Sequence, residues 1–270
     1  MGKQTNIEWA HATWSPWHGC LKVSSGCQFC YAESLSKRFG QNIWGPESTT
    51  TRRIMSDYHW SQPLVWNRQA QAAQQRMRVF PSMCDPFESH HLLNGERERF
   101  WNLIEKTPWL DWLLLTKRPE NVTEMVPRKW LLEAPRSSYW PNQWPANVWI
   151  GTSVENQEYA NIRINQLCQI PAQIRFLSLE PLIGPIDLEE SLDIATCGLS
   201  DGQIDWIICG AESGPKARPM DLNWVRTIRD QCKQGKIPFF FKQTATNGKK
   251  ESMPELDGEV WAQYPEVQTA

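Results

Sequence analysis

Six apolar runs recur along the chain at intervals of about 30 residues, the length of a strand plus a crossover helix. The runs are almost continuously apolar rather than alternating, which is typical of strands buried on both faces of a parallel sheet. No long linker interrupts the series, so we expect one α/β domain over residues 1–245 and a polar tail over 246–270. The runs lie at 77–83, 112–115, 148–151, 174–179, 204–209 and 238–241.

Helical patterns occupy the segments between these runs. We predict helices at 96–106, 119–132, 157–168 and 222–234, and two earlier ones at 31–40 and 63–75. Gly40 suits the position that ends the helix beginning at residue 31. A short strand is expected near 12–14. The order of elements predicts an α/β fold, a partial (β/α) TIM-type barrel with parallel strands.

The composition is that of a globular protein that contains a sizeable core. Of 270 residues, 40% are hydrophobic and 21% charged, and the formal net charge of −2 argues against a broad basic surface for nucleic acid. No apolar run approaches the ~18–20 residues of a membrane span, and the polar start is not a signal peptide. We therefore expect a cytoplasmic protein without membrane contact. In that compartment, cysteines are reduced, metal-bound or buried rather than paired as disulfides.

The densest chemical signal is a cysteine loop at residues 18–31. It contains Cys20, Cys27 and Cys30 in a C-x6-C-x2-C pattern. Three thiolates leave a four-position metal centre one ligand short, as in catalytic zinc sites and in iron–sulfur clusters that expose one iron. A closed structural zinc site completed by His18 is an alternative, and a disulfide with one free thiol is a weaker one.

Ionisable or polar residues follow the ends of successive apolar runs. In a parallel barrel the carboxyl ends of the strands open on one face, which carries the active site. Each residue taken alone could instead start a loop or cap a helix. Because the pattern recurs along the series, we expect the side chains to meet at one mouth; they are Asp85, Lys117, Ser153, Glu155, Glu180, Glu212 and Lys242.

Seven segments between residues 5 and 245 carry a family resemblance. They are Thr-Trp-Ser-Pro-Trp-His-Gly-Cys, Gly-Cys-Gln-Phe-Cys-Tyr-Ala-Glu, Cys-Asp-Pro-Phe, Leu-Leu-Thr-Lys-Arg-Pro-Glu, Trp-Ile-Gly-Thr-Ser-Val-Glu-Asn, Phe-Leu-Ser-Leu-Glu-Pro-Leu and Cys-Gly-Ala-Glu-Ser-Gly. On these segments the chain resembles the radical S-adenosylmethionine (radical SAM) superfamily, and more closely a phage-associated three-Cys-motif family within or beside it. The first gap of the cysteine motif has six residues here, whereas the commonest spacing of the superfamily has three. The Asp-Pro-Phe and Leu-Thr-Lys segments also resemble those of spore photoproduct lyase, which repairs thymine lesions in DNA.

The resemblance implies a [4Fe–4S] cluster on Cys20, Cys27 and Cys30, with S-adenosylmethionine on the fourth iron. Reductive cleavage of that cosubstrate yields a 5′-deoxyadenosyl radical, which takes a hydrogen atom from the substrate. The resemblance also implies cofactor contacts from four residues. The strand-end pattern supplies the candidate catalytic residues, although Asp85, Glu180, Glu212 and Lys242 could serve the substrate or loop structure. The cofactor residues are Tyr31, Lys117, Ser153 and Glu155, and the catalytic candidates are Lys117, Glu180 and Glu212.

The substrate is the least determined part of the prediction. The resemblance to a DNA-lesion lyase, the basic Arg52 and Arg53, and tryptophans that could stack on bases favour a nucleobase, nucleotide or nucleic acid. A small metabolite, or a cluster- or zinc-binding partner module without radical chemistry, stays open. The stacking candidates are Trp14, Trp17 and Trp44, although core packing is the more common role of tryptophan. His11, His59, His90 and His91 have no partner spacing and are expected on the surface or in loops.

Overall fold

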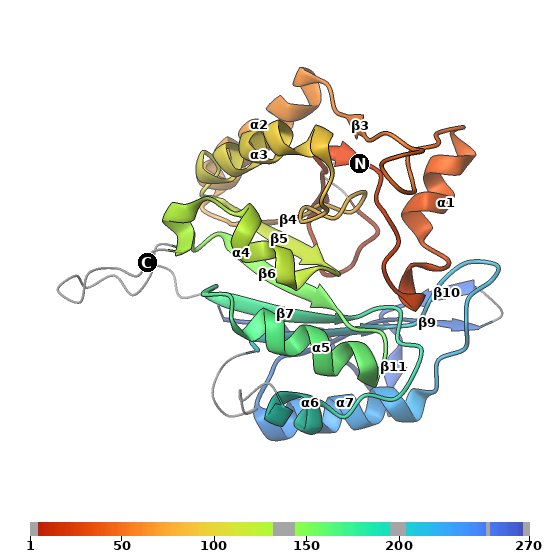
Figure 1. Cartoon of the computed structure of the whole chain (residues 1–270). Coiled ribbons are helices and arrows are strands. Elements are labelled where there is room, and N and C mark those ends of the chain that lie inside the picture. Colours follow the sequence, from red (N-terminus) through yellow and green to blue (C-terminus); the bar gives the residue numbers. More distant parts are fainter. Residues whose placement is uncertain (1–4, 132–143, 195–203, 247–248, 267–270) are drawn as a thin grey trace. The chain divides into compact units, whose positions relative to one another are not determined.

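The computed structural model is a mixed α/β protein, described here for residues 5–131, 144–194, 204–246 and 249–266 (Figure 1). Its main sheet has eight strands, mostly parallel, in the order β1-β4-β5-β6-β7-β8-β9-β10. The predicted α/β class with a largely parallel sheet is confirmed. The strands are β1 (Ala12–Thr13), β4 (Met77–Phe80), β5 (Leu110–Thr116), β6 (Val148–Ser153), β7 (Ile174–Leu179), β8 (Trp206–Gly210), β9 (Phe239–Thr246) and β10 (Lys249–Ser252).

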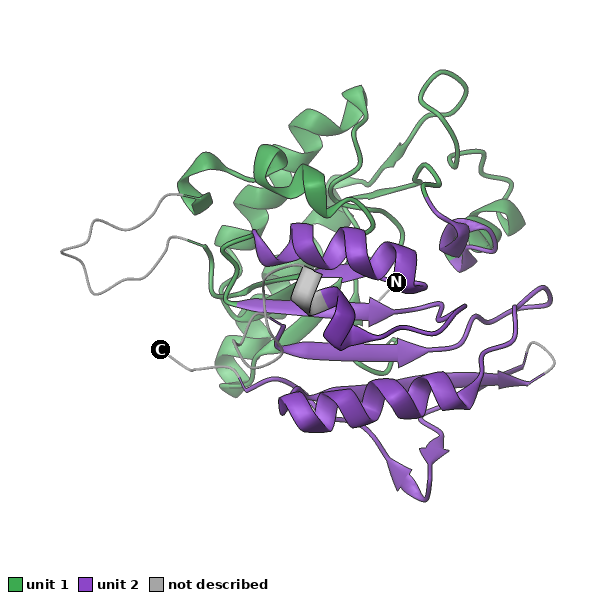
Figure 2. Cartoon of the chain, turned by 60° about the horizontal axis from the view of Figure 1, so that its bottom comes forward, with its two compact units in different colours: residues 1–23, 32–150, 170–173 green, residues 24–31, 151–169, 174–270 purple. Residues whose placement is uncertain are grey.

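The chain divides into two compact units, coloured separately in Figure 2. Unit 1 comprises residues 1–23, 32–150 and 170–173, and unit 2 comprises residues 24–31, 151–169 and 174–270. The sequence predicted a single domain to residue 245. The boundary falls inside the cysteine loop, so Cys20 belongs to unit 1, whereas Cys27 and Cys30 belong to unit 2.

Unit 1 is built around tryptophan. Trp14 is fully buried, with ring centroids 5.5 Å from both Phe100 and Trp112. Strand β4 pairs in parallel with β1 and β5, Val79 lying opposite Ala12 and Trp112. The other elements of the unit are β2 (Trp17–His18), α1 (Tyr31–Arg38, without its first residue), β3 (Arg53–Ile54), α2 (Asp57–Ala73), η2 (His91–Leu93), α3 (Asn94–Glu105), η3 (Pro119–Asn121), α4 (Val122–Met125) and η4 (Arg128–Leu131).

Helix α2 begins six residues before the predicted start at Pro63. Ser56 caps it by accepting a hydrogen bond from the His59 amide, and the helix continues through Pro63. A proline inside a helix leaves the carbonyl four residues earlier without its donor. Here that carbonyl belongs to His59, and it accepts a bond of 2.9 Å from the Trp14 indole. The proline is tolerated because a core tryptophan replaces the missing donor.

The helix predicted at 119–132 is instead three short pieces, η3, α4 and η4. Pro127 disfavours helical conformation at the residue before it, and Val126 is extended, with φ −83° and ψ 159°. Residue 132 lies outside the described residues. The predictions at 31–40 and 157–168 match the structure more closely, and Gly40 has the left-handed φ of +68° that ends α1.

Unit 2 contains the parallel strands β7, β8 and β9. Strand β8 lies between the other two, with Leu177 opposite Ile207 and Ile208 opposite Phe240. A Cβ on Gly151 would lie 2.6 Å from Cδ2 of Phe176, so only glycine allows this packing in β6. The remaining elements are η1 (Ser25–Cys27), α5 (Gln157–Cys168), α6 (Leu188–Ile194), α7 (Leu222–Gly235), β11 (Glu255–Leu256) and β12 (Glu259–Val260).

The predicted polar tail contains strands up to Val260 and a bridge residue at Ala262. Strand β10 pairs antiparallel with the second half of β9, Lys249 opposite Thr246. Further on, Phe241 donates its amide to the Trp261 carbonyl at 2.9 Å, and Gln263 donates to Phe239 at 3.1 Å. Both halves of β9 therefore form hydrogen bonds with residues after 246.

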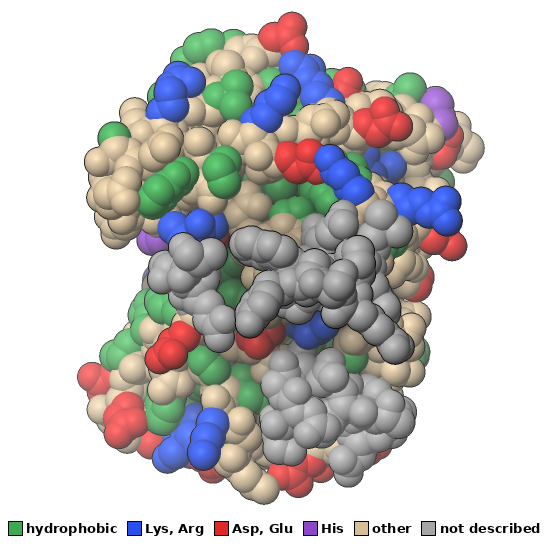
Figure 3. Space-filling model, turned by 90° about the vertical axis from the view of Figure 1, so that its left-hand side faces the viewer, with side chains coloured by type: hydrophobic (Ala, Val, Ile, Leu, Met, Phe, Trp, Pro, Cys, Tyr) green, Lys and Arg blue, Asp and Glu red, His purple; other side chains and the backbone are tan. Residues whose placement is uncertain are grey.

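The face drawn in Figure 3 shows no large patch of one charge among its described side chains. Among the described side chains on that face, Lys and Arg are interspersed with Asp and Glu, as the net charge of −2 leads one to expect. Within the described part of the chain, no helix is both long and apolar enough to cross a bilayer.

Candidate functional site

The turn that carries Cys27 and Cys30 is held by a buried carboxylate of unit 2. Ser24 donates its hydroxyl to Glu155 Oε1 at 2.6 Å, and the same hydroxyl lies 3.6 Å from the Cys27 sulfur. The turn continues as η1 and leads directly into α1, at whose start Cys30 lies. One serine thus connects the Cys27 thiol to Glu155, a residue that follows β6.

Glu155 is fully buried and forms an ion pair with Arg163. Arg163 Nη1 donates to Glu155 Oε2 at 2.8 Å and to the Ser153 carbonyl, also at 2.8 Å. Gly26 lies directly against the carboxylate, because a Cβ there would be 2.7 Å from the Glu155 carboxyl carbon. A buried pair with both partners hydrogen-bonded fixes geometry more than it adds stability. What it fixes here is the cysteine turn.

A second cation holds the turn from another strand end. Arg218 binds Glu212 through two nitrogens at 2.6 and 2.8 Å, and its Nη1 donates to the Ser25 carbonyl at 3.0 Å. Its guanidinium also lies 5.4 Å from the Phe29 ring centroid. Hydrogen bonding to Glu212 raises the pKa of Arg218. Glu212, which follows β8, therefore reaches the cysteine turn through Arg218.

Cys20 lies among charged groups of unit 1. Gly19 and Cys20 bridge in parallel to Cys84 and Trp44, respectively. Arg118 Nη1 lies 3.7 Å from the Cys20 sulfur and 2.6 Å from Asp85 Oδ2, and Nη2 donates to the Leu21 carbonyl at 2.6 Å. One guanidinium thus binds the thiol, the next backbone carbonyl and a carboxylate.

The local environment keeps Cys20 protonated when no metal is bound. Burial raises the pKa of Cys20, and the carboxylates of Glu88 and Asp85 raise it further, whereas Arg118 opposes them. Burial likewise raises the pKa of Cys84. A metal ion would have to displace the proton of Cys20, and Arg118 would then face a sulfur anion.

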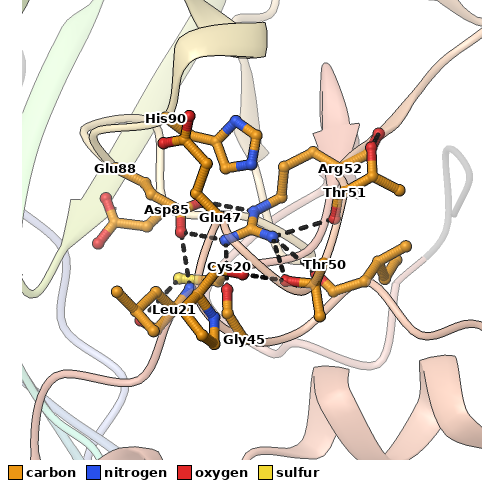
Figure 4. Close-up of polar contacts among 12 residues, drawn as sticks. Cys20, Leu21, Gly45, Glu47, Thr50, Thr51, Arg52, Asp85, Glu88 and His90 are labelled. Atoms are coloured by element: carbon orange, nitrogen blue, oxygen red, sulfur yellow. Dashed lines mark hydrogen bonds and ion pairs between the residues drawn. The ribbon is translucent and has the colours of Figure 1, made fainter.

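Glu88 and Arg52 form a buried ion pair in the same unit (Figure 4). Their side chains are 2% and 1% exposed, and Arg52 binds both carboxylate oxygens, at 2.6 and 2.9 Å. Glu88 Oε1 also accepts the Leu21 amide at 2.7 Å. The pair therefore holds the residue after Cys20 as well as the loop that precedes Arg52. The expectation that Arg52 contacts phosphate is wrong, because its guanidinium is buried and paired.

The other predicted site residues separate into three environments. Lys117 is half-buried, and its amide donates to Asp85 Oδ2 at 3.2 Å. Ser153 is buried at the end of β6, whereas Tyr31 is 51% exposed at the start of α1. Glu180 Oε1 lies 2.8 Å from Lys242 Nζ, so these two strand-end groups form an ion pair.

In unit 2, Glu155 and Glu212 both hold the turn that carries Cys27 and Cys30, the first through Ser24 and the second through Arg218. Glu180 separately pairs with Lys242. In unit 1 the structure gathers Cys20 with Lys117, which share Asp85 as a neighbour through Arg118. The cosubstrate contacts of Ser153, Glu155 and Lys117 stay predictions.

The sequence prediction missed the arginines that hold these groups. They are Arg118, Arg163 and Arg218. A signal was available, since a carboxylate predicted to be buried needs a cation or several donors. Arg163 follows Glu155 by eight residues and Arg218 follows Glu212 by six, within reach of a short loop or two helical turns.

Two of the tryptophans proposed for base stacking cannot serve that purpose. Trp14 and Trp17 are fully buried, so neither offers a face to a base, and that expectation is wrong. Among the other cysteines, Cys209 and Cys232 are buried as predicted and Cys168 is half-buried. Cys197 lies outside the described residues.

A family model matches residues 4–265, nearly the whole chain, including both halves of the cysteine loop and every strand-end residue discussed above. The chain belongs to this family. Its description is "Protein of unknown function (DUF5131)". No curated protein and no solved structure matches the chain. Membership in the DUF5131 family therefore gives the cysteine turn and its buried supports a wider context but assigns them no activity.

Proposed function

We propose that this protein is an iron–sulfur enzyme of the radical SAM type, with a [4Fe–4S] cluster held by Cys20, Cys27 and Cys30. The observation that carries the proposal is the support of the cysteine turn. A fully buried carboxylate, Glu155, and its cation Arg163 are committed to holding Ser24, beside the Cys27 sulfur. Such a support is expected where thiol positions matter, as they do for metal ligands.

The donor set fits a thiolate-ligated centre. None of the seven cysteines within the described residues is in a disulfide, and Cys20, Cys27 and Cys30 are half-buried. Arg118 offers Cys20 a donor that becomes favourable once the sulfur is anionic. Free thiols are also what a reducing cytoplasm maintains.

When bound, the cluster and S-adenosylmethionine supply a 5′-deoxyadenosyl radical that removes a hydrogen atom from the substrate. The chain's own residues bind and orient. Lys117 is proposed to bind the cosubstrate carboxylate, with its backbone fixed by Asp85. Tyr31, exposed beside Cys30, is proposed to cover the centre. The largely parallel sheet is compatible with the partial (β/α) barrel that the resemblance implies.

A nucleobase, nucleotide or nucleic acid is the proposed substrate class, supported by the resemblance to a DNA-lesion lyase. Exposed basic side chains available for phosphate contacts include Arg38 of α1 and Arg53 of β3, whereas the exposed Lys37 pairs with Glu33. The burial of Trp14 and Trp17 removes one argument for it. Such a substrate, if in a duplex, would have to be flipped out to reach a reactive centre.

A zinc site is the second candidate, and one observation favours it. His18 Nε2 is buried and has no hydrogen-bond partner among the described residues, two positions before Cys20. Burial lowers the pKa of His18 to about 4, so the ring is neutral near pH 7. A neutral imidazole with an unused nitrogen is a suitable fourth ligand beside three thiolates.

Metal analysis of anaerobically purified protein separates the two. The iron–sulfur proposal predicts a brown protein with about four iron and four sulfide ions per chain, whose visible absorption is bleached by dithionite. Cys27→Ser should lose most of the iron, whereas Cys168→Ser, a half-buried cysteine at the end of α5, should keep it. One zinc ion per chain without sulfide would reject the cluster and support the site with His18.

Substrate class is tested with cluster-loaded protein. Single-stranded DNA, duplex DNA, tRNA-like RNA and free nucleotides are added, and release of 5′-deoxyadenosine is measured at low and moderate salt. Stimulated release that weakens with salt would support a nucleic acid. If none of these stimulates release while a small-molecule fraction of a cell extract does, the nucleic-acid class is rejected.

A further inference from the structure

Two consecutive histidines and a glutamate gather in unit 1, outside the cysteine loop of residues 18–31. Glu47, His90 and His91 each offer one ligand atom, and these atoms all lie within 4.8 Å of one another. The two imidazole rings are stacked, with centroids 5.0 Å apart and planes inclined by 13°. His91 Nδ1 contacts Glu47 Oε1. Two imidazoles and one carboxylate are ligands that zinc and similar ions accept.

The buried member of the group has an unused nitrogen. His90 is 4% exposed, and its Nε2 has no hydrogen-bond partner among the described residues. Its other nitrogen, Nδ1, accepts the Leu92 amide at 3.3 Å, the long end of the range for such a bond. Buried polar atoms nearly always have a partner, so the orphan nitrogen calls for one that the chain does not supply.

The backbone explains why neighbouring histidines point the same way. His90 is extended, with φ −160° and ψ 130°, and the chain then turns into η2 at His91. In a regular strand, consecutive side chains would point to opposite faces. The change of conformation at His90 instead brings both rings to one side, facing the loop that carries Glu47.

Two buried arginines fix the loops that carry the three residues. Arg52 donates to the Gly45 carbonyl at 2.9 Å and to Thr50 Oγ1 at 3.2 Å, on either side of Glu47, and it also pairs with Glu88 (Figure 4). Arg97 donates to the carbonyls of Pro86 and Glu88, just before His90. The loop of Glu47 and the loop of the histidines are therefore joined by charged hydrogen bonds independent of any metal.

We propose that Glu47, His90 and His91 form a binding site for a divalent transition-metal ion of the zinc type. His90 Nε2, one His91 nitrogen and a Glu47 oxygen would be the ligands, with water in the remaining position. Binding moves the His90 proton from Nε2 to Nδ1, which ends the long bond with Leu92. It also displaces the proton shared by His91 and Glu47, and that proton goes to solvent. The ion ties the Glu47 loop to the segment after Glu88.

The probe for this site is Co²⁺, added to metal-free protein under anaerobic conditions. Cobalt bound to cysteine gives sulfur-to-metal charge-transfer absorption, whereas a site of two histidines and a glutamate gives only weak visible bands. Beyond any cobalt held by the cysteines, we expect one equivalent of Co²⁺ that adds no charge-transfer absorption and is displaced by Zn²⁺. His91→Ala and Glu47→Gln change exposed side chains and should fold normally, and each should weaken this binding at least tenfold.

Two controls keep the test decisive. Glu124→Gln, a change at an exposed glutamate in α4, should leave the affinity unchanged. Zn²⁺ should also protect the exposed His91 from diethyl pyrocarbonate in wild-type protein but not in Glu47→Gln. If His91→Ala and Glu47→Gln bind as many ions as wild type with equal affinity, or if all bound cobalt shows the charge-transfer band, the site does not exist. Neither result bears on the cluster proposed at Cys20, Cys27 and Cys30.

Discussion

Replacing Gly26 with alanine would place one methyl group against the buried carboxylate of Glu155. The added Cβ would lie 2.7 Å from the carboxyl carbon and closer still to Cγ and Oε1. Gly26 does not have a left-handed φ, so the backbone accepts alanine and the effect comes from this contact alone. Because Glu155 is fully buried, it can move aside only by giving up its bonds to Ser24 and Arg163.

The cost follows from those two bonds. Hydrogen bonds to charged groups contribute about 1.5–3 kcal/mol each, and leaving one partner of a buried ion pair unmatched costs about 3–5 kcal/mol. Partial relaxation of Glu155 would preserve some of the contact with Arg163. We therefore expect Gly26→Ala to lower the free energy of unfolding by about 3 kcal/mol, near the low end of that range. Release of Ser24 should also expose the Cys27 thiol.

The measurements are urea unfolding followed by tryptophan fluorescence, and the alkylation rate of Cys27 followed by peptide mass spectrometry. Gly95→Ala in α3 is the control, since no atom lies within 4 Å of its Cβ and helix propensity favours alanine. In a Glu155→Ala background the cost of Gly26→Ala should fall below about 0.5 kcal/mol. A loss under about 1 kcal/mol in the wild-type background, or an equal loss in both backgrounds, would refute the reasoning.

Three further predictions concern other parts of the molecule. Arg52→Leu leaves Glu88 buried without its cation and should lower the free energy of unfolding in urea by about 3–5 kcal/mol. The control Arg53→Leu, at an exposed side chain, should change that free energy by less than about 0.5 kcal/mol. Equal effects would contradict the buried pair. Burial lowers the pKa of His59, so the unfolded chain binds its proton more readily and stability should fall as pH drops below about 6.5. In the His59→Asn variant, the free energy of unfolding in urea should fall less steeply between about pH 7 and pH 5 than in wild type. An identical dependence on pH in the two proteins would argue against this assignment. Lys117→Ala should weaken S-adenosylmethionine binding to cluster-loaded protein about tenfold by calorimetry without loss of iron, and unchanged affinity would reject its proposed role.

The strands were predictable because their signal is local. A run such as 174–179 is apolar at nearly every position, and a segment of that kind has few alternatives to a buried parallel strand. Helix α5 was equally clear, since Asn156 supplies a cap and the apolar positions repeat at helical spacing. The start of α2 was missed because Pro63 signals a helix start by itself. The compensating donor, the Trp14 indole, lies 49 residues earlier in the sequence.

The candidate site was predictable in its residue types and less so in their partners. The cysteine pattern and the strand-end glutamates are visible in the sequence, but which cation neutralises each glutamate depends on how loops fold back. Glu47 and the histidine pair are 43 residues apart and lie in loops without periodicity. Their spacing in the sequence does not predict that Glu47 contacts the histidines. The contact depends on the turn at His90 and on the hydrogen bonds that Arg52 and Arg97 donate to the two loops.

The last residues of the chain cover the edge of strand β9 that does not pair with β8. Strand β9 pairs with β8 on one side, and its other side is covered by β10 along one half and by residues 261–263 along the other. A chain ended at residue 245, the predicted domain boundary, would expose the unpaired amides and carbonyls of a strand rich in phenylalanine. Exposed apolar edges of this kind recruit strands from other molecules. Removal of the last 25 residues should therefore increase aggregation as measured by light scattering, although no residue of the candidate site is lost.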